Sequence, residues 1–483
     1  MNKYQKLAGN TIIFAIGSFG AKILSFFLTR LYTGCLSSEE FGSADLLYQA
    51  VNVIYPIVTL SMADAVIRFG MEKKNDMRSI FTVAISATVM GLALLALLSP
   101  LFNLTEMYGD YAFLLYVYCY FSCFRQIAAN FVRAKGYVKL FALDGIIAIL
   151  TMVISNVIFL LVLDMGVIGY VMSFIVSDFL SFSGLCLVAG LHKYLDFKYF
   201  STRLFKDMLK YSAPLIPTYV LWWITSSSDR WIVTAICGKG INGVYSVANK
   251  IPTLLMMFTT VFFQAWQMSA IENRDDKGLS KFYSKVYGAY SSLLAIAAAG
   301  VILFVRPLTY LIVHGKQICY TLVDFKIETN FLFSYHYTPM LVIAMVFQCL
   351  CQFLSSVYNV KKKSVNSMIT SFIAAIVNIV LNILFIPKYG AYGAALATAA
   401  AYASCFIVRI FDVRRFIPFK AGNLRMLINT VLVAAMAFIS IAEINLAYLW
   451  LILIFLLVTA FNFGAVLSTL KKILNRRGEA VDS

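Results

Sequence analysis

The chain has 483 residues, of which 61% are hydrophobic and only 13% are charged. Soluble globular proteins are about 45–50% apolar and about 25% charged, so this composition excludes a soluble protein and predicts an all-α polytopic membrane protein. Lys and Arg outnumber Asp and Glu by 40 to 23. No segment outside the apolar runs is long enough to carry a nucleic-acid-binding surface, so nucleic acid is not expected as a partner.

Apolar runs of about the length of a membrane crossing predict fourteen transmembrane helices. The first run follows MNKYQK without a small-residue cleavage site, which indicates an uncleaved span rather than a signal peptide. The approximate bounds of the predicted helices are 9–33, 42–67, 79–102, 111–132, 140–163, 167–190, 213–236, 244–270, 286–305, 331–358, 365–386, 391–411, 426–442 and 447–470.

The basic residues outside these spans are concentrated on one side. Both termini and the loops on their side hold 29 Lys and Arg, whereas the opposite loops hold five. Cytoplasmic loops carry the excess of Lys and Arg in membrane proteins. The distribution therefore predicts a multi-pass protein of a cell membrane with both termini in the cytoplasm.

An internal repeat predicts two halves. Residues 131–169 and 357–393 each contain a basic turn, an apolar span with a late Asn, and a G-x-x-G hinge. Parallel repeats suit two pseudo-symmetric six-helix lobes around an axis along the membrane normal. The predicted divisions are an N-lobe of helices 1–6 at 1–192, a cytoplasmic linker at 193–212, a C-lobe of helices 7–12 at 213–412, and helices 13–14 with a cytoplasmic tail at 413–483.

Basic residues within the spans are the first candidates for function. An ionisable group at the bilayer centre costs roughly 2.5–3.5 kcal/mol to insert and is by default a functional candidate. Such residues can bind phosphate oxygens through charge-assisted hydrogen bonds. Arg30 could instead extend to the lipid headgroups, and this behaviour is expected of Arg409. The residues predicted to line an anion-binding cavity are Lys22, Arg30, Arg125, Arg230 and Lys250.

Carboxylates within the spans are candidates for coupling to H⁺ or Na⁺. Coupling needs a carboxylate that can change its state in a low dielectric. Asp178 and Asp229 are the deepest of the acidic residues, although Asp229 and Arg230 could serve assembly alone. Asp45, Asp64 and Asp144 are further candidates. With three His and no Cys pair at metal-ligand spacing, neither a metal site nor another cofactor is expected.

Prolines interrupt several predicted spans. Pro56 in the second helix and Pro252 in the eighth occupy corresponding places in the two halves, and Pro214, Pro217 and Pro339 lie in two other spans. Broken helices at matched places indicate a transport site, although a proline kink can also serve packing alone.

Three motifs carry a resemblance to a known family. They are EEFG after the first span, SDRWIV followed by GVYSVANKIP at the seventh and eighth, and NIVLNILFIPKYGAYGAALAT from Asn378 to Thr398. These stretches resemble the polysaccharide-type flippases of the multidrug/oligosaccharidyl-lipid/polysaccharide exporter superfamily. The resemblance covers essentially the whole chain.

The resemblance implies two six-helix lobes in a V shape that work by alternating access, driven by an ion gradient or the membrane potential. The family moves undecaprenyl-pyrophosphate-linked oligosaccharides across the bacterial cytoplasmic membrane. That cargo, membrane lipid and polysaccharide polymerase machinery are the implied partners. Basic residues on helices 1 and 8 of related lipid II flippases handle the pyrophosphate, and Lys22, Arg30 and Lys250 lie on the matching helices.

Sugar recognition would involve lumen residues such as Tyr219, Trp222 and Trp223. Two alternatives stay open. A cation-coupled multidrug exporter of the same superfamily would usually have twelve spans and favour cationic drugs. An integral-membrane glycan polymerase or ligase would need a large outer catalytic loop, whereas the longest outer segment, about 306–330, shows no catalytic spacing.

Overall fold

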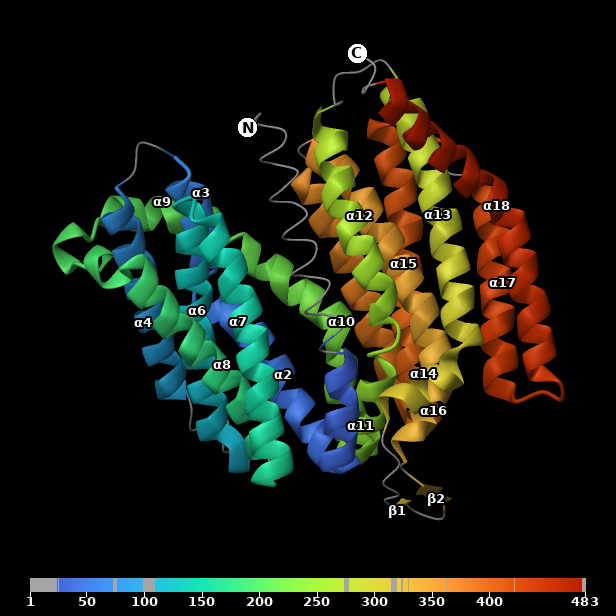
Figure 1. Cartoon of the computed structure of the whole chain (residues 1–483), viewed down its shortest axis with the longest axis horizontal. Coiled ribbons are helices and arrows are strands. Elements are labelled where there is room, and N and C mark those ends of the chain that lie inside the picture. Colours follow the sequence, from blue (N-terminus) through green and yellow to red (C-terminus); the bar gives the residue numbers. More distant parts are fainter. Residues whose placement is uncertain are drawn as a thin grey trace. The chain divides into compact units, whose positions relative to one another are not determined.

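The computed structural model describes most of the chain as helix (Figure 1). The residues described are 24, 26–72, 76–98, 109–272, 278–313, 319–322, 325–328, 330–361, 363–420 and 422–479. They fall into two compact units, Met1–Trp223 and Ile224–Ser483. This division lies within one helix, α10 (Leu215–Cys237), and the predicted lobe boundaries stay a prediction.

The first unit is a helical bundle in which α6 packs against α2, α3 and α8, and α7 against α8. A helical segment at 26–35 precedes the bundle. The elements are α2 (Ser38–Val58), α3 (Met62–Gly70), α4 (Met77–Leu98), η1 (Gly109–Tyr111), α6 (Ala112–Ala134), α7 (Val138–Asn156), η2 (Val157–Val162), α8 (Gly166–Ala189), η3 (Leu191–Tyr194), η4 (Phe197–Tyr199) and α9 (Thr202–Ser212).

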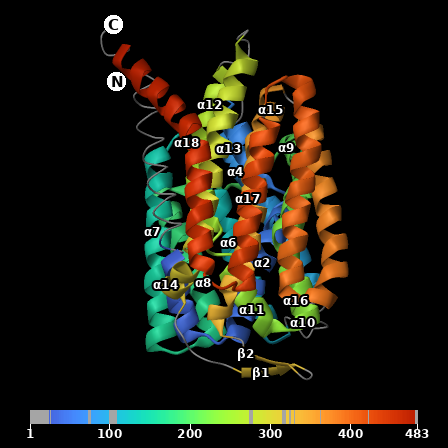
Figure 2. The ribbon, with the colours of Figure 1, turned by 90° about the vertical axis from the view of Figure 1, so that its right-hand side faces the viewer.

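The second unit is built around α15, which packs against α11, α12, α13, α16 and α17. Figure 2 shows α17 and α18 side by side in front of α13, which both contact. The elements after α10 are α11 (Lys239–Ala248), α12 (Thr253–Glu272), α13 (Leu279–Leu303), α14 (Val305–Ile312), β1 (Cys319–Leu322), β2 (Phe325–Glu328), η5 (Phe331–Phe333), α15 (Ser334–Lys361), α16 (Ser364–Phe416), α17 (Asn423–Ala442) and α18 (Ala447–Glu479). The two strands form a short antiparallel hairpin that the sequence did not predict.

The helices confirm a polytopic membrane protein. Among the described residues, nine helices are long and apolar enough to cross a membrane, or ten if α2 and α3, bent by 53°, form one span. The total of fourteen stays a prediction, because most of the first predicted span lies outside the described residues. The predicted helices 365–386 and 391–411 correspond to the two halves of α16, which are separate helices on either side of a sharp kink at Gly390.

The predicted interruption of helices 2 and 8 is confirmed. The chain leaves the helical conformation between α2 and α3, where Leu60 and Ser61 have positive φ. The predicted helix 244–270 is two helices, α11 and α12, separated by a turn that contains Pro252. Proline lacks the N–H that would continue the helical hydrogen bonds. Pro339, in contrast, lies inside α15 without ending it.

The first glycines of the two G-x-x-G hinges share a positive φ. Gly166 and Gly390 have φ of +56° and +57°, a conformation that L side chains rarely adopt. The second glycine of each hinge packs against the preceding helical turns. A Cβ on Gly169 would lie 3.1 Å from the carbonyl oxygen of Phe159, and a Cβ on Gly393 would lie 2.4 Å from that of Phe385.

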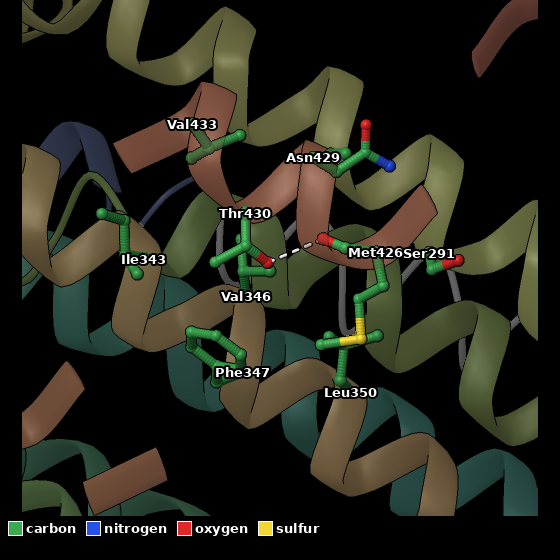
Figure 3. Close-up of a pocket in the computed structure, with 10 residues that line it drawn as sticks. Ser291, Ile343, Val346, Phe347, Leu350, Met426, Asn429, Thr430 and Val433 are labelled. Carbon is green, nitrogen blue, oxygen red and sulfur yellow. Dashed lines mark hydrogen bonds between the residues drawn. The ribbon is translucent and has the colours of Figure 1, made fainter. Parts of the chain in front are cut away.

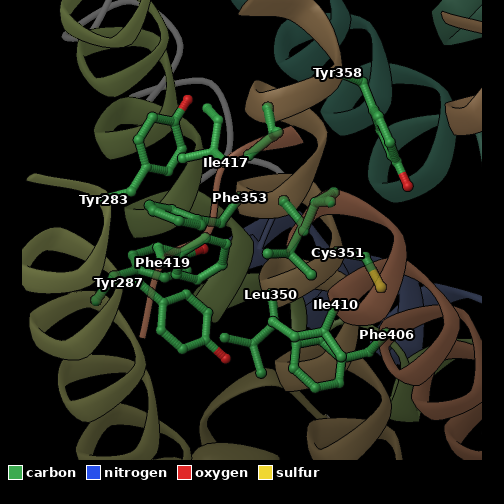
Figure 4. Close-up of a cluster of buried hydrophobic side chains, with 14 of the residues drawn as sticks. Tyr283, Tyr287, Leu350, Cys351, Phe353, Tyr358, Phe406, Ile410, Ile417 and Phe419 are labelled. Atoms are coloured by element: carbon green, nitrogen blue, oxygen red, sulfur yellow. The ribbon is translucent and has the colours of Figure 1, made fainter. Parts of the chain in front are cut away.

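An aromatic core joins α12, α13 and α15 (Figure 4). Trp266 stacks on Phe353 with ring centroids 5.1 Å apart and donates from Nε1 to Ser356 Oγ at 3.0 Å. Tyr283 and Tyr287 of α13 pack edge-on or tilted against the same Phe353 ring. Each aromatic side chain buries about 150–250 Å², so this cluster holds the three helices together.

Candidate functional site

A charged cluster lies where α6, α7 and α8 meet in the first unit. Arg125 of α6 donates from Nη1 to Asp178 Oδ1 at 2.8 Å and from Nε to Ser181 Oγ at 2.9 Å. Its Nη2 lies 3.9 Å from Asp144 Oδ2 of α7. Ser181 in turn donates a short hydrogen bond to Asp144. The side chains of Asp144 and Asp178 are only 8% and 9% exposed.

Two carboxylates therefore share one guanidinium inside the bundle. With both aspartates ionised, the three charged side chains would carry a net negative charge, which is costly in an apolar surrounding. Sharing a proton or a cation between the aspartates would remove that cost. The arrangement favours coupling at Asp178 over pyrophosphate binding at Arg125, because Nε and Nη1 of the guanidinium already donate to Ser181 and Asp178. Both roles stay predictions.

The predicted basic residues of the first helix can be followed only in part. Lys22 lies outside the described residues. Arg30 is exposed, and its backbone carbonyl accepts a hydrogen bond from Thr33 Oγ1 at 3.3 Å. The helix ends shortly before Ser37, which forms a capping box with Glu40 at the start of α2. This cap satisfies two backbone donors and fixes the turn after Arg30.

In the second unit, Asp229 is the centre of a buried polar network. The residue is 2% exposed. Tyr245 of α11 donates from its hydroxyl to Asp229 Oδ2 at 2.5 Å, and Thr398 of α16 donates to the same oxygen at 3.3 Å. The backbone N–H of Arg230 donates to Asp229 Oδ1 at 2.9 Å. Neutral donors from three helices thus converge on this carboxylate.

Two asparagines extend the network. Asn378 of α16 donates to Thr398 Oγ1 at 3.3 Å and accepts from Ser228 and Asn382 at 3.2 and 3.0 Å. The Oδ1 atom of Asn382 is buried and has no hydrogen-bond partner among the described residues. Because α16 is kinked at Gly390, its two halves bring Asn378 and Thr398 together. The kink therefore builds the network around Asp229 and offers oxygen ligands that suit a hard cation.

The second unit holds two of the basic residues predicted to bind pyrophosphate. Arg230 lies next to the network around Asp229, and Lys250 lies at a helix break. Arg230 is half-buried, and its side chain leaves α10 about 100° from that of Asp229. Lys250 is half-buried in the turn between α11 and α12, where its N–H donates to the Val247 carbonyl at 2.9 Å. Arg230 thus lies within a helix next to the buried Asp229, whereas Lys250 lies in a turn between two helices. Their binding of pyrophosphate stays a prediction.

The aromatic residues predicted for sugar binding lie at the start of α10. Tyr219 donates to Asp64 Oδ2 at 3.0 Å, and Trp223 donates from Nε1 to the Gln49 carbonyl at 2.9 Å. Trp222 is 43% exposed. Two of the three polar groups therefore attach α10 to α2 and α3, while the side chains of Tyr219 and Trp222 are equally exposed, at 43% each.

The expectation that Arg409 extends to the headgroups is wrong. Its residue exposure is 4%, and its guanidinium binds neutral acceptors of α15 and α16. The bonds of Nη1 run to the Cys351 carbonyl at 3.0 Å and Ser355 Oγ at 2.7 Å, while Nη2 reaches Thr370 Oγ1 at 2.8 Å. Enough oxygen acceptors surround this arginine to satisfy its donors inside the protein, which removes the need for water or headgroups.

A small pocket lies elsewhere in the second unit, between α13, α15 and α17 (Figure 3). Its walls are largely apolar, with the polar groups of Ser291, Asn429 and Thr430 at its edge. The volume open to water-sized groups is about 30 Å³, roughly the space of one water molecule. This pocket cannot hold an oligosaccharide as it stands.

Two partners at these clusters were not anticipated from the sequence. Ser181 bridges Arg125 and Asp144, and Tyr245 donates the shortest bond to Asp229. The only signal was the position of each polar group inside an apolar span, one helix away from a buried aspartate. Such a position indicates a polar partner but does not say which one.

The fold and the buried charges define a polytopic membrane protein with ionisable groups inside its helical bundles, a pattern typical of transporters. Residues 7–267, more than half of the chain, match the family model described as polysaccharide biosynthesis protein, and the chain belongs to this family. Residues 321–462 match the model of the lipid II flippase MurJ. These matches confirm the family resemblance drawn from the motifs.

Solved structures show the same fold. A lipid II flippase MurJ in an inward closed conformation is 19% identical with a TM-score of 0.72, over 95% of this chain and 99% of that one. An inward-facing multidrug resistance MATE family transporter of the MOP superfamily is 14% identical with a TM-score of 0.66, over 84% and 98%. A MOP superfamily transporter from Pyrococcus furiosus is 14% identical with a TM-score of 0.58, over 85% and 95%. No curated protein sequence matches the chain.

Proposed function

We propose that this protein is a flippase that moves undecaprenyl-pyrophosphate-linked oligosaccharide units from the inner to the outer leaflet of the bacterial cytoplasmic membrane. It would work by alternating access, without covalent chemistry, and supply units for a surface polysaccharide and its polymerase machinery. Both termini would lie in the cytoplasm. The main support is the pair of family matches, to polysaccharide biosynthesis proteins at 7–267 and to the MurJ flippase at 321–462.

The charges within the helices support an anionic cargo. Lys22, Arg30, Arg230 and Lys250 would bind the pyrophosphate, because Lys and Arg form strong charge-assisted bonds with phosphate oxygens. Lys250 is the most informative of these to change, since it lies half-buried in the break between α11 and α12, one of the two matched helix interruptions. We expect Lys250→Gln to lower flipping strongly while Lys388→Gln, at an exposed lysine of the hinge, leaves it unchanged.

Asp229 is our preferred site for coupling to H⁺ or Na⁺, with Asp178 as the second candidate. A carboxylate that is bound by neutral donors and excluded from water gains most from a proton or a cation. The neighbouring oxygens of Thr398 and Asn378 belong to the two halves of α16. Occupancy of the site would therefore bias how these halves sit at the Gly390 hinge.

Depletion of the protein in its host tests the proposal. Undecaprenyl-pyrophosphate-linked glycans are extracted and quantified by mass spectrometry, and the surface polysaccharide is measured in parallel. Accumulation of a complete repeat unit with loss of surface polymer would support the flippase and identify its cargo. An unchanged lipid-linked pool with intact polysaccharide would favour a multidrug exporter, as the multidrug resistance MATE transporter of similar fold is described. Accumulation of flipped, unpolymerised units would favour a polymerase.

A further inference from the structure

The segment 191–212 between α8 and α10, here called the linker segment, combines exposed aromatic and basic side chains. Its sequence holds five Lys or Arg and two Asp. Three of its apolar side chains are exposed, Phe197 by 70% and Leu195 and Phe200 by 40% each. Large apolar groups exposed together mark an interaction surface rather than a solvated loop.

The linker segment is held firmly at the beginning of α4. Thr82 Oγ1 lies 3.2 Å from the backbone oxygens of Tyr194 and Asp196, and the Asp196 N–H donates back to it at 3.2 Å. The Arg78 guanidinium lies 5.5 Å from the ring centre of Tyr199. The exposure of the neighbouring aromatic residues is therefore a property of a fixed surface.

Helix α9, at the end of the linker segment, is amphipathic. Met208 is buried, and the helix packs against α3 and α4. Arg203, Lys206 and Lys210 are all exposed, and their spacing of three and four residues places them along one outer face. The exposed Asp207 lies on the same face, so three positive charges and one negative charge leave it net positive, in the same segment as the exposed aromatic residues.

The linker segment lies at the end of α4 that is opposite its exposed apolar residues. Further along α4, the apolar side chains of Met90, Leu94 and Leu97 are exposed, as expected for a helix that faces lipid. The linker segment contacts the other end of this helix, next to Arg78 and Thr82. Figure 1 shows this green segment beside α4 at the edge of the first unit.

We propose that the linker segment binds the anionic lipid surface of the membrane that the protein spans. Phe197, Phe200 and Leu195 would enter the boundary between headgroups and acyl chains, and the basic row of α9 would pair with lipid phosphates. Interfacial helices bind in this way, through buried apolar area and attraction to anionic lipids. The contact would fix the start of α10 at the cytoplasmic surface. It does not depend on which cargo the protein carries.

The full-length protein, reconstituted in vesicles, allows a direct test. A fluorinated phenylalanine replaces Phe197, and its ¹⁹F signal is broadened by lipids that carry a nitroxide near the headgroup. We expect strong broadening in phosphatidylcholine vesicles that contain phosphatidylglycerol and weaker broadening in phosphatidylcholine alone. Each basic residue near an anionic surface contributes about fivefold to association. The triple variant R203Q/K206Q/K210Q should therefore lose the difference between the two vesicle types.

A matched site in another helix controls for folding and insertion. Phe372 in α16 is 51% exposed, so a probe there should be broadened by acyl-chain nitroxides equally in both vesicle types and in the triple variant. A Phe197 signal that headgroup nitroxides do not broaden would overturn the proposal. Equal broadening of the Phe197 signal in the two vesicle types, in the protein without the three basic substitutions, would also overturn it. This comparison does not require the triple variant to fold.

Discussion

Substitution of Gly393 by alanine tests the close packing behind the hinge of α16. The new Cβ would lie 2.4 Å from the carbonyl oxygen of Phe385 and 2.6 Å from its carbonyl carbon. Favourable contacts between heavy atoms lie at about 3.5–4.0 Å, so the two halves of α16 must separate by roughly 1 Å. The obstacle is backbone on both sides and cannot be relieved by a change of rotamer.

The cost can be estimated from overpacked cores, in which an inserted methyl group costs about 1–3 kcal/mol. We expect the upper part of this range for Gly393→Ala, because the backbone cannot rotate away. A shift of this size would also break the bond of Asn378 to Thr398, which is already 3.3 Å long. The variant should therefore lose both stability and the geometry around Asp229.

The assay is thermal unfolding of the purified protein in detergent, followed by transport in vesicles. Gly288→Ala in α13 is the matched control, since a Cβ there meets nothing within 4 Å. Alanine is favoured over glycine in a helix by up to about 1 kcal/mol, so the control should be neutral or slightly stabilised. An unfolding temperature of Gly393→Ala equal to that of the control would refute the close approach.

Three further predictions concern single side chains. Arg409→Lys should lower the free energy of unfolding by about 2–3 kcal/mol, because lysine cannot reach all the buried acceptors. The control Arg415→Lys, at an exposed site, should change it by less than about 0.5 kcal/mol. Equal effects of the two variants in thermal unfolding would contradict this reasoning. The hydrogen bond from Tyr335, with nearby positive charge, lowers the pKa of Glu443. A carboxylate with a lowered pKa stabilises the fold at pH values above its ordinary pKa, and this stabilisation is lost as the pH falls through the lowered pKa. Glu443→Gln should therefore be less stable than the parent at neutral pH, by less than about 1 kcal/mol, and equally stable in strong acid. A stability difference that persists in strong acid would count against this interaction. Under the proposed function, Asp229→Asn should abolish the dependence of flipping on an H⁺ or Na⁺ gradient in vesicles, and an unchanged dependence would move the coupling site to Asp178.

The sequence was most informative where local chemistry decides the structure. Long apolar runs predicted the helices, and glycine and proline predicted where they bend, at Gly390, Pro252 and the end of α2. These residues act through their own backbone, so their effect needs no knowledge of neighbours. The two helices predicted on either side of Pro387 and Gly390 are the two halves of α16, which separate at Gly390.

The side-chain clusters could be predicted only in part, because their partners come from other helices. Asp229 was recognisable as a costly buried charge, but its bonds to Tyr245 and Thr398 join positions 16 and 169 residues away in the chain. Arg409 is a second example, in which the sequence predicted exposure and the structure shows burial. Its position near a span end favoured the headgroups, whereas acceptors contributed by α15 and the start of α16 keep it buried.

The adjacency of Asp229 and Arg230 suggests how ion and cargo could be linked within the second unit. The N–H of Arg230 donates to Asp229 Oδ1, so the same residue carries the proposed phosphate ligand and one of the donors of the proposed ion site. Any movement of this peptide that accompanies phosphate binding changes the carboxylate that the ion occupies. Linkage makes the effect reciprocal: an ion that favours one arrangement of the peptide must change the affinity for phosphate by the same factor. With Thr398 and Asn378 on opposite sides of the Gly390 hinge, that factor can be expressed as a change in the angle of α16.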